Sequence, residues 1–229
     1  EKECTLFMGL FAIMNILIYS NTQLEDMIIG CPVSGRDESE WDNQIGCFIN
    51  IIAIRTRLKK ENSFGELLVN VKEQLLNAYE NQVYPFDELV AALKLKQDDS
   101  HNPLFDIMMS FHNAEVTATK SAEGLKNLEL LPFAIAQNSL CKYDMVLNFF
   151  ENAEELVLST EFNTDIFTDS YIDFFLDQFV YTLDLIGKNN IANIFEISKQ
   201  LKLLEEEKQD RLIQAARGNN LKKLRKQKS

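Results

Sequence analysis

Apolar residues in the first part of this chain follow first a helical and then a strand-like pattern. Residues 5–20 are apolar around most of a helical surface, which predicts a helix buried on several sides. Two shorter apolar runs, 27–33 and 47–58, predict internal strands. The first run has a proline, Pro32, next to its end, and the residues Ser34 to Asp37 that follow it predict a turn.

The next segment predicts two helices separated by a proline. Ser63 and Glu66 form a capping-box pattern, in which each side chain satisfies a backbone N–H at the start of a helix. Apolar residues continue that helix at three-four spacing to Ala78. Tyr84-Pro85-Phe86 then interrupts the chain, and the proline suits the first turn of a short helix that ends near residue 93.

The C-terminal half predicts further strands and two long helices. Strands are expected at 104–111, 128–131, 143–150 and 156–162, the last two as a β-hairpin. Thr168 should cap a helix through Ile186, with Gly187 at its end. A charged helix is expected from about 199 to 217, followed by a basic tail. Hairpin and crossover connections both occur, so the predicted fold class is α/β, with a mixed β-sheet flanked by helices.

Composition narrows the function classes. The net charge of −12 argues against a nucleic-acid binder, which needs a basic field. The apolar run 6–19 is shorter than the about 20 residues that a membrane span needs, so no membrane partner is expected. Four scattered cysteines, with no secretory signal, favour a reducing cytoplasm and free, mostly buried thiols. Only His101 and His112 are available as histidines, too few for a zinc site, and no metal is expected.

Several segments, in this order, resemble the later motifs of the condensation domains of non-ribosomal peptide synthetases. The similarity runs from about Cys4 to Gly187. No segment is decisive alone, but the shared order and spacing of the set carry the resemblance. The matching segments are 5–8, 28–36, 45–50, 81–90, 98–106, 142–144 and 161–167.

The chain departs from the family pattern in two ways. His101 and Gln97 stand where the family often has arginine. The family's His-His-x-x-x-Asp-Gly signature is absent. In the family that signature lies in the N-terminal of two similar lobes, which form a fold like that of chloramphenicol acetyltransferase. Because Glu1 is not a methionine and leads almost directly into a helix, we expect the chain to begin inside a larger protein and to supply the C-terminal lobe.

The resemblance implies site residues but no catalytic residue in this chain. Arg36, presented by Ser34 and Gly35, would pair with the aspartate of the absent signature, because a planar guanidinium suits a buried carboxylate. An exposed turn arginine is the alternative. Asn50 would face the substrate tunnel and contact the substrate or the phosphopantetheine arm, the alternative being a solvated edge-strand asparagine. Structural roles are expected for a further set of residues: Tyr84, Pro85, Phe86, Ser100, Asn102 and Pro103.

By the same resemblance, the complete domain joins a donor aminoacyl or peptidyl thioester to an acceptor amine in secondary-metabolite biosynthesis. The partners would be the N-terminal lobe, peptidyl carrier proteins that present 4′-phosphopantetheine, and an adjacent adenylation domain. No cofactor would bind the chain directly, and the fragment alone should be inactive. Residues 1–190 would form the lobe and 191–229 a linker helix and basic tail. The alternatives are a non-catalytic docking lobe, or degenerate condensation domain, and a coenzyme A-dependent acyltransferase of the same fold.

Overall fold

The structure is a computed structural model that describes residues 3–36, 38–95, 102–113, 141–152, 154–188 and 193–226, with side chains as far as residue 211. The chain divides into two units. One comprises Glu1–Glu25, Arg57–Asn70 and Ile172–Ser229. The other comprises Asp26–Thr56 and Val71–Tyr171, and it contains every site residue predicted above.

Helix α1 (Leu6–Thr22) forms the core of the first unit. Thr5 caps it, its Oγ1 accepting the backbone N–H of Met8 at 3.3 Å. Every residue from Leu10 to Ser20 is buried, which confirms the prediction of a helix covered on several sides. Asn15 is fully buried within it and donates to the carbonyl oxygen of Phe11 at 2.7 Å.

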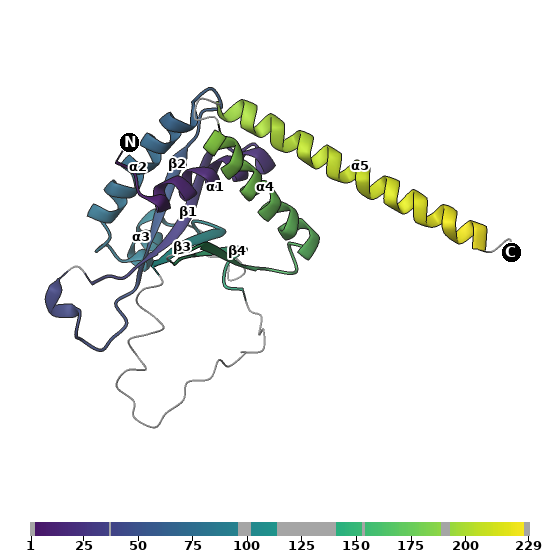
Figure 1. Ribbon diagram of the computed structural model, residues 1–229. Coiled ribbons are helices and arrows are strands. Elements are labelled where there is room, and N and C mark those ends of the chain that lie inside the picture. The colour runs from purple at the N-terminus through teal and green to yellow at the C-terminus, as the bar shows by residue number, and fades with distance from the viewer. Residues whose placement is uncertain are drawn as a thin grey trace. The chain divides into compact units, whose positions relative to one another are not determined.

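Two further helices of this unit, α4 (Asp169–Lys188) and α5 (Ile194–Lys226), follow one another, and α5 continues as one long helix (Figure 1). Thr168 caps α4 as predicted, accepting the N–H of Tyr171 at 3.3 Å. The prediction that Gly187 ends α4 is wrong, because this glycine is still helical. A glycine costs a helix only about 1 kcal/mol. The last turn also gains an ion pair between Lys188 and Asp184.

The predicted start of the charged helix is also wrong, by five residues. Helix α5 begins at Ile194, where Asn193 accepts the N–H of Glu196 at 2.8 Å. Ile194, Ile197 and Leu201 are buried at three-four spacing, so burial of an apolar stripe extends the helix towards its N-terminus. The helix also runs through the segment expected to be a tail.

The second unit is built on a five-stranded sheet with the order β2-β1-β3-β4-β5. Its strands are β1 (Asp26–Val33), β2 (Asn50–Arg57), β3 (Ile107–Asn113), β4 (Met145–Glu151) and β5 (Leu156–Phe162). β1, β3 and β4 run parallel, and β5 returns antiparallel to β4, which confirms the mixed sheet and the predicted hairpin. An ion pair between Arg55 and Asp26 places the end of β2 beside the start of β1. β2 is therefore antiparallel to β1.

Helices α2 (Phe64–Glu80) and α3 (Phe86–Leu93) and the 3-10 turn η1 (Ser39–Trp41) complete the fold. The predicted capping box is confirmed: Glu66 donates its N–H to Ser63 Oγ at 3.3 Å, and Ser63 donates its N–H to Glu66 Oε2 at 2.7 Å. Pro85 is the N-cap of α3 rather than part of its first turn. The strand expected at 128–131 lies outside the described residues.

The sheet buries its two faces to different extents. Side chains alternate between buried and half-buried positions along β1 and β2. Because successive side chains of a strand point to opposite faces, Ile29, Ile52 and Ile54 belong to the buried face. Cys31 also lies there, but the expectation of mostly buried thiols is wrong: Cys4 and Cys141 are half-buried and Cys47 is exposed.

Candidate functional site

The turn after β1 holds three of the predicted site residues. Gly35 has a φ of 62°, and a Cβ atom at this position would lie 1.8 Å from the carbonyl oxygen of Phe48. Only glycine fits, since both the backbone conformation and the close approach exclude a side chain. Ser34 supports the turn by accepting the backbone N–H of Arg36 at 3.4 Å. The turn therefore presents Arg36 in a defined direction.

The guanidinium of Arg36 is held within its own loop. It donates to the carbonyl oxygens of Trp41 and Gln44, the latter at 3.0 Å. It also lies over the ring of Phe48, 4.3 Å from the ring centroid, and that ring stacks on Trp41 at 6.0 Å. The two carbonyl oxygens accept hydrogen bonds from part of the guanidinium N–H groups, and the cation–π contact fixes the plane of the guanidinium.

This arrangement gives Arg36 a role in the loop that the sequence did not indicate. The side chain is half-buried, so it is not a freely exposed turn arginine. Two of its five N–H groups have the carbonyl partners named above, and no carboxylate pairs with it among the described residues. The expected pairing with an aspartate from another lobe remains a prediction. Phe48 could have been suspected beforehand, since it stands within the matched segment 45–50.

Asn50, the first residue of β2, ties that strand to the loop before α3. Its Nδ2 donates to the carbonyl oxygens of Gln82 at 2.7 Å and Tyr84 at 2.9 Å. Its Oδ1 accepts the backbone N–H of Phe86 at 3.2 Å. Pro85, the N-cap of α3, makes no side-chain hydrogen bond. Asn50 on β2 therefore satisfies the N–H of Phe86 at the start of this helix. Both donors of the carboxamide are used within the chain, and the expected substrate contact remains a prediction.

The Tyr84-Pro85-Phe86 and Asn102-Pro103 segments meet in an aromatic cluster. Phe105 packs against Phe86 at 5.6 Å and Tyr143 at 5.4 Å between ring centroids. Its ring also lies so close to β1 that a Cβ on Gly30 would be 2.2 Å from it. Asn102 fixes the preceding turn, its Oδ1 accepting the N–H groups of Leu104 at 3.0 Å and Phe105 at 3.2 Å.

These contacts are the kind that the structural role expected for these segments requires. Pro103 is half-buried beside the Asn102 turn, whereas Ser100 and His101 lie outside the described residues. Gly30 and Tyr143 belong to the matched segments 28–36 and 142–144, and sequence inspection assigned neither a role in the cluster.

Other chemistries find little support in the described part of the chain. Complete burial raises the pKa of the Cys31 thiol far above its usual range, so this cysteine stays protonated and is a poor nucleophile. The described residues contain no group of three or more His, Cys, Asp or Glu side chains arranged for a metal ion. None of the described helices combines the length and apolar character needed to cross a bilayer.

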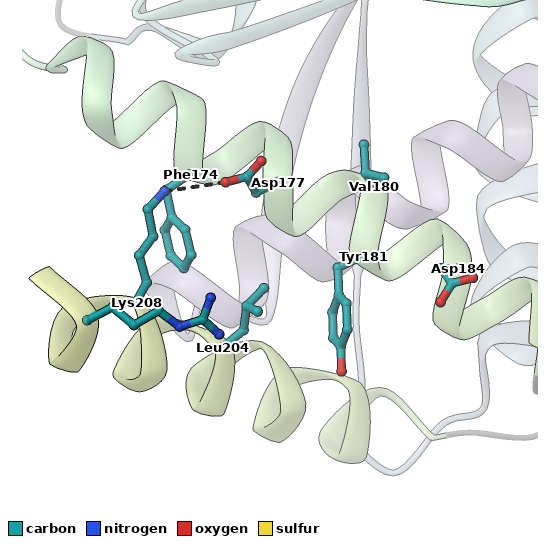
Figure 2. A pocket seen from close by; sticks show the side chains of 8 residues that line it. Phe174, Asp177, Val180, Tyr181, Asp184, Leu204 and Lys208 are labelled. Atoms are coloured by element: carbon teal, nitrogen blue, oxygen red, sulfur yellow. Dashed lines mark hydrogen bonds and ion pairs between the residues drawn. The ribbon is translucent and has the colours of Figure 1, made fainter.

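A groove with a volume of about 570 Å³ runs between α4 and α5 (Figure 2). Phe174 and Tyr181 contribute aromatic surface, and Lys208 lies 4.5 Å from the centroid of the Phe174 ring. Lys208 also pairs with Asp177 at 3.4 Å. None of the predicted site residues lines this groove. The charged side chains Asp177, Asp184 and Arg211 that line it each make a solvent-exposed ion pair.

Comparison with known proteins identifies one family. The family model described as "Condensation domain" matches residues 1–213. The chain is 36% identical over 214 residues to gramicidin S synthase 2 of Brevibacillus brevis, which covers 93% of this chain and 5% of that protein. It is 34% identical over 206 residues to tyrocidine synthase 3 of Brevibacillus parabrevis, covering 90% and 3%. The chain thus spans a small fraction of the length of these relatives.

Solved structures share the fold. A holo four-domain nonribosomal peptide synthetase bound to AMP and glycine matches 85% of this chain and 16% of its own, with a TM-score of 0.69 and 22% identity. The condensation domain of Monacolin K polyketide synthase matches 84% of this chain and 44% of its own, with a TM-score of 0.71 and 19% identity. At these identities the likeness concerns the fold, which is therefore the chloramphenicol acetyltransferase-like fold of condensation domains.

Proposed function

Because the chain belongs to the condensation domain family, we propose that it is the C-terminal lobe of a non-ribosomal peptide synthetase condensation domain and forms one wall of the cleft where a peptide bond is made. The observation that carries the proposal is the family match over residues 1–213, in a sequence whose two histidines do not form the family's histidine signature. The reacting imidazole then belongs to the other lobe.

The proposed reaction is an acyl transfer between two carrier-bound substrates. The amine of the acceptor attacks the thioester carbonyl of the donor, so a C–N bond forms and the C–S bond breaks. The amine loses a proton, and the departing sulfur of the donor's phosphopantetheine arm gains one. An imidazole with a pKa near neutrality suits the task of positioning the amine and accepting its proton.

Within this scheme the chain supports the catalytic lobe rather than performing the proton transfer. Arg36 would offer its remaining N–H groups to the aspartate of the histidine signature. The contacts with Trp41, Gln44 and Phe48 favour this role, because they orient the guanidinium before the lobes meet. Asn50 would line the same wall, with its carboxamide held by the loop before α3.

Assays with loaded carrier proteins test the proposal. The chain alone should give no dipeptidyl product by mass spectrometry, whereas the full-length protein that contains it should. Turnover by the chain alone would refute the assignment of the base to another lobe. Carrier binding without product from the full-length protein would favour the docking-lobe alternative.

A variant series in the full-length protein isolates the role of Arg36. We expect Arg36→Ala to lower turnover by about a hundredfold or more, the effect of removing one partner of a buried ion pair. Arg36→Lys should recover part of the loss, because it keeps the charge but not the planar fork. Phe48→Leu is the matched comparison: it removes one of the contacts that orient the guanidinium and keeps the charge, so it should lower turnover by clearly less than Arg36→Ala does. Equal losses in Arg36→Ala and Phe48→Leu would show that Arg36 only stabilises the loop.

A further inference from the structure

A polar strip crosses the face of the sheet opposite the buried one. It consists of Ser110 and His112 on β3 and Asn148 and Phe150 on β4. Strand register pairs Ser110 with Asn148 and His112 with Phe150, so all four side chains lie on one face. The same face carries Met108 and Val146 two residues earlier, which belong to the aromatic cluster around Phe105. The strip thus begins where the apolar packing ends.

Hydrogen bonds within the strip connect its three polar side chains. The hydroxyl of Ser110, which is only 6% exposed, donates to Asn148 Oδ1 at 2.5 Å. Ser110 Oγ also lies 2.9 Å from His112 Nε2. The imidazole also stacks on Phe150, with ring centroids 4.9 Å apart and an angle of 17° between the planes. A buried serine and a stacked ring therefore hold an exposed imidazole in one orientation.

The direction of these bonds determines what the strip offers a ligand. Since the Ser110 proton goes to Asn148, the Ser110 oxygen accepts from His112, and Nε2 carries the imidazole proton. In a neutral imidazole the other nitrogen, Nδ1, is then an acceptor. Asn148 Nδ2 is a donor. Neither atom has a hydrogen-bond partner among the described residues, and Asn148 is half-buried while His112 is exposed.

One acceptor and one donor on adjacent strands match a secondary amide, which presents one N–H and one carbonyl oxygen. We propose that this strip binds a secondary amide of an extended, uncharged substrate chain, with His112 Nδ1 accepting the amide N–H and Asn148 Nδ2 donating to its carbonyl. The inference rests on the proposed function, which supplies two sources of such amides: the pantetheine arm and a peptidyl donor. The half-buried Met108 provides apolar surface for the neighbouring methylene groups.

His112 is assigned contact with the substrate, not proton transfer at the reacting carbon. Its Nε2 is engaged with Ser110, and the stacking on Phe150 prevents the ring from turning without losing that contact. The expected signature of such a residue is a change in KM with little change in kcat, because a contact made equally in the ground state and the transition state alters binding alone.

The test couples a change in the protein to a change in the substrate, in the full-length protein that contains this chain. Peptidyl-pantetheine substrates are compared with analogues in which one amide is replaced by an ester, which keeps the carbonyl and removes the N–H. One set of analogues carries the ester in the pantetheine arm and another carries it in the peptidyl part. Comparing the two sets identifies which amide binds. For the wild type, the ester at the bound position should raise KM roughly fivefold to tenfold, the effect of one lost hydrogen bond.

The His112→Ala variant should raise KM for the amide substrate by a similar factor, and the difference between amide and ester should vanish. His112→Gln should restore part of the preference for the amide, because the carboxamide oxygen of glutamine is again an acceptor. Val157→Ala is the matched control. Val157 is an exposed apolar residue on β5, where it pairs with Phe150 of β4, and its side chain carries no polar atom. It should leave KM and kcat unchanged.

Equilibrium binding of the same amide and ester compounds separates this inference from the proposed function. If the wild type binds them with the expected amide preference but forms no peptide bond, the inference that the strip binds an amide is supported and the proposed function fails. If the wild type is active and His112→Ala keeps its full amide preference at every ester position, the strip is not the binding site and the inference is overturned.

Discussion

Replacing Asn50 with alanine provides the sharpest test of the structural role found for this residue. One carboxamide makes three hydrogen bonds, to the carbonyl oxygens of Gln82 and Tyr84 and the N–H of Phe86. Each is worth about 0.5 to 1.5 kcal/mol net. Since Asn50 is half-buried and Tyr84 is exposed, water replaces part of what is lost. We therefore expect Asn50→Ala to lower the free energy of unfolding by about 2 kcal/mol.

Urea unfolding followed by circular dichroism measures this change, and a shift in midpoint at constant slope marks a change in stability alone. Hydrogen exchange supplies a local readout: the amide of Phe86 should lose protection, because its acceptor is the Asn50 side chain. Asn81→Ala is the matched control, since Asn81 is exposed and makes one side-chain bond to the described residues, to the carbonyl oxygen of Asn77. It should cost no more than about 0.5 kcal/mol. An Asn50→Ala variant as stable as this control, with Phe86 still protected, would refute the reasoning.

Two further predictions concern packing and reactivity in the second unit. Gly30→Ala should destabilise the chain by about 1 to 3 kcal/mol, because its Cβ would overlap the ring of Phe105. In a Phe105→Leu background the added cost should fall below about 0.5 kcal/mol, and additive costs in a double-mutant cycle would contradict the clash. In the folded chain at pH 8, maleimide should label the exposed Cys47 and spare Cys31 until urea is added. Burial raises the pKa of the Cys31 thiol, so the reactive thiolate is scarce throughout the neutral range, and equal labelling of both would contradict this.

Features that depend on near neighbours in the chain were open to prediction from the sequence alone. A run that is apolar around most of the helical surface located α1, the three-four spacing of apolar residues located α2, and the Ser63 and Glu66 pair marked the start of α2. The hairpin of β4 and β5 followed from two strand-like runs around a short segment with glutamate and asparagine residues. In each case the decisive interactions join residues of one element or of two elements that follow directly along the chain. The order of matched segments also predicted the family, which the family model confirms.

The neighbours of the site residues depended on the tertiary structure. Nothing in the local pattern indicates that Asn50 contacts the loop before α3, more than thirty residues away, because that contact depends on where the chain returns to the sheet. Helix ends were also missed: Gly187 suggested a stop, but the energetic penalty of one glycine is small compared with the interactions that continue a helix.

The polar strip shows the same division between sequence and structure. The sequence shows Ser110 and His112 two positions apart on a strand and therefore on one face. Only the parallel register of β3 with β4 brings Asn148 and Phe150 beside them, from a segment nearly forty residues later. Strand order and register are set by how the whole apolar surface of the sheet is buried, and that is a property of the folded chain rather than of any window along it.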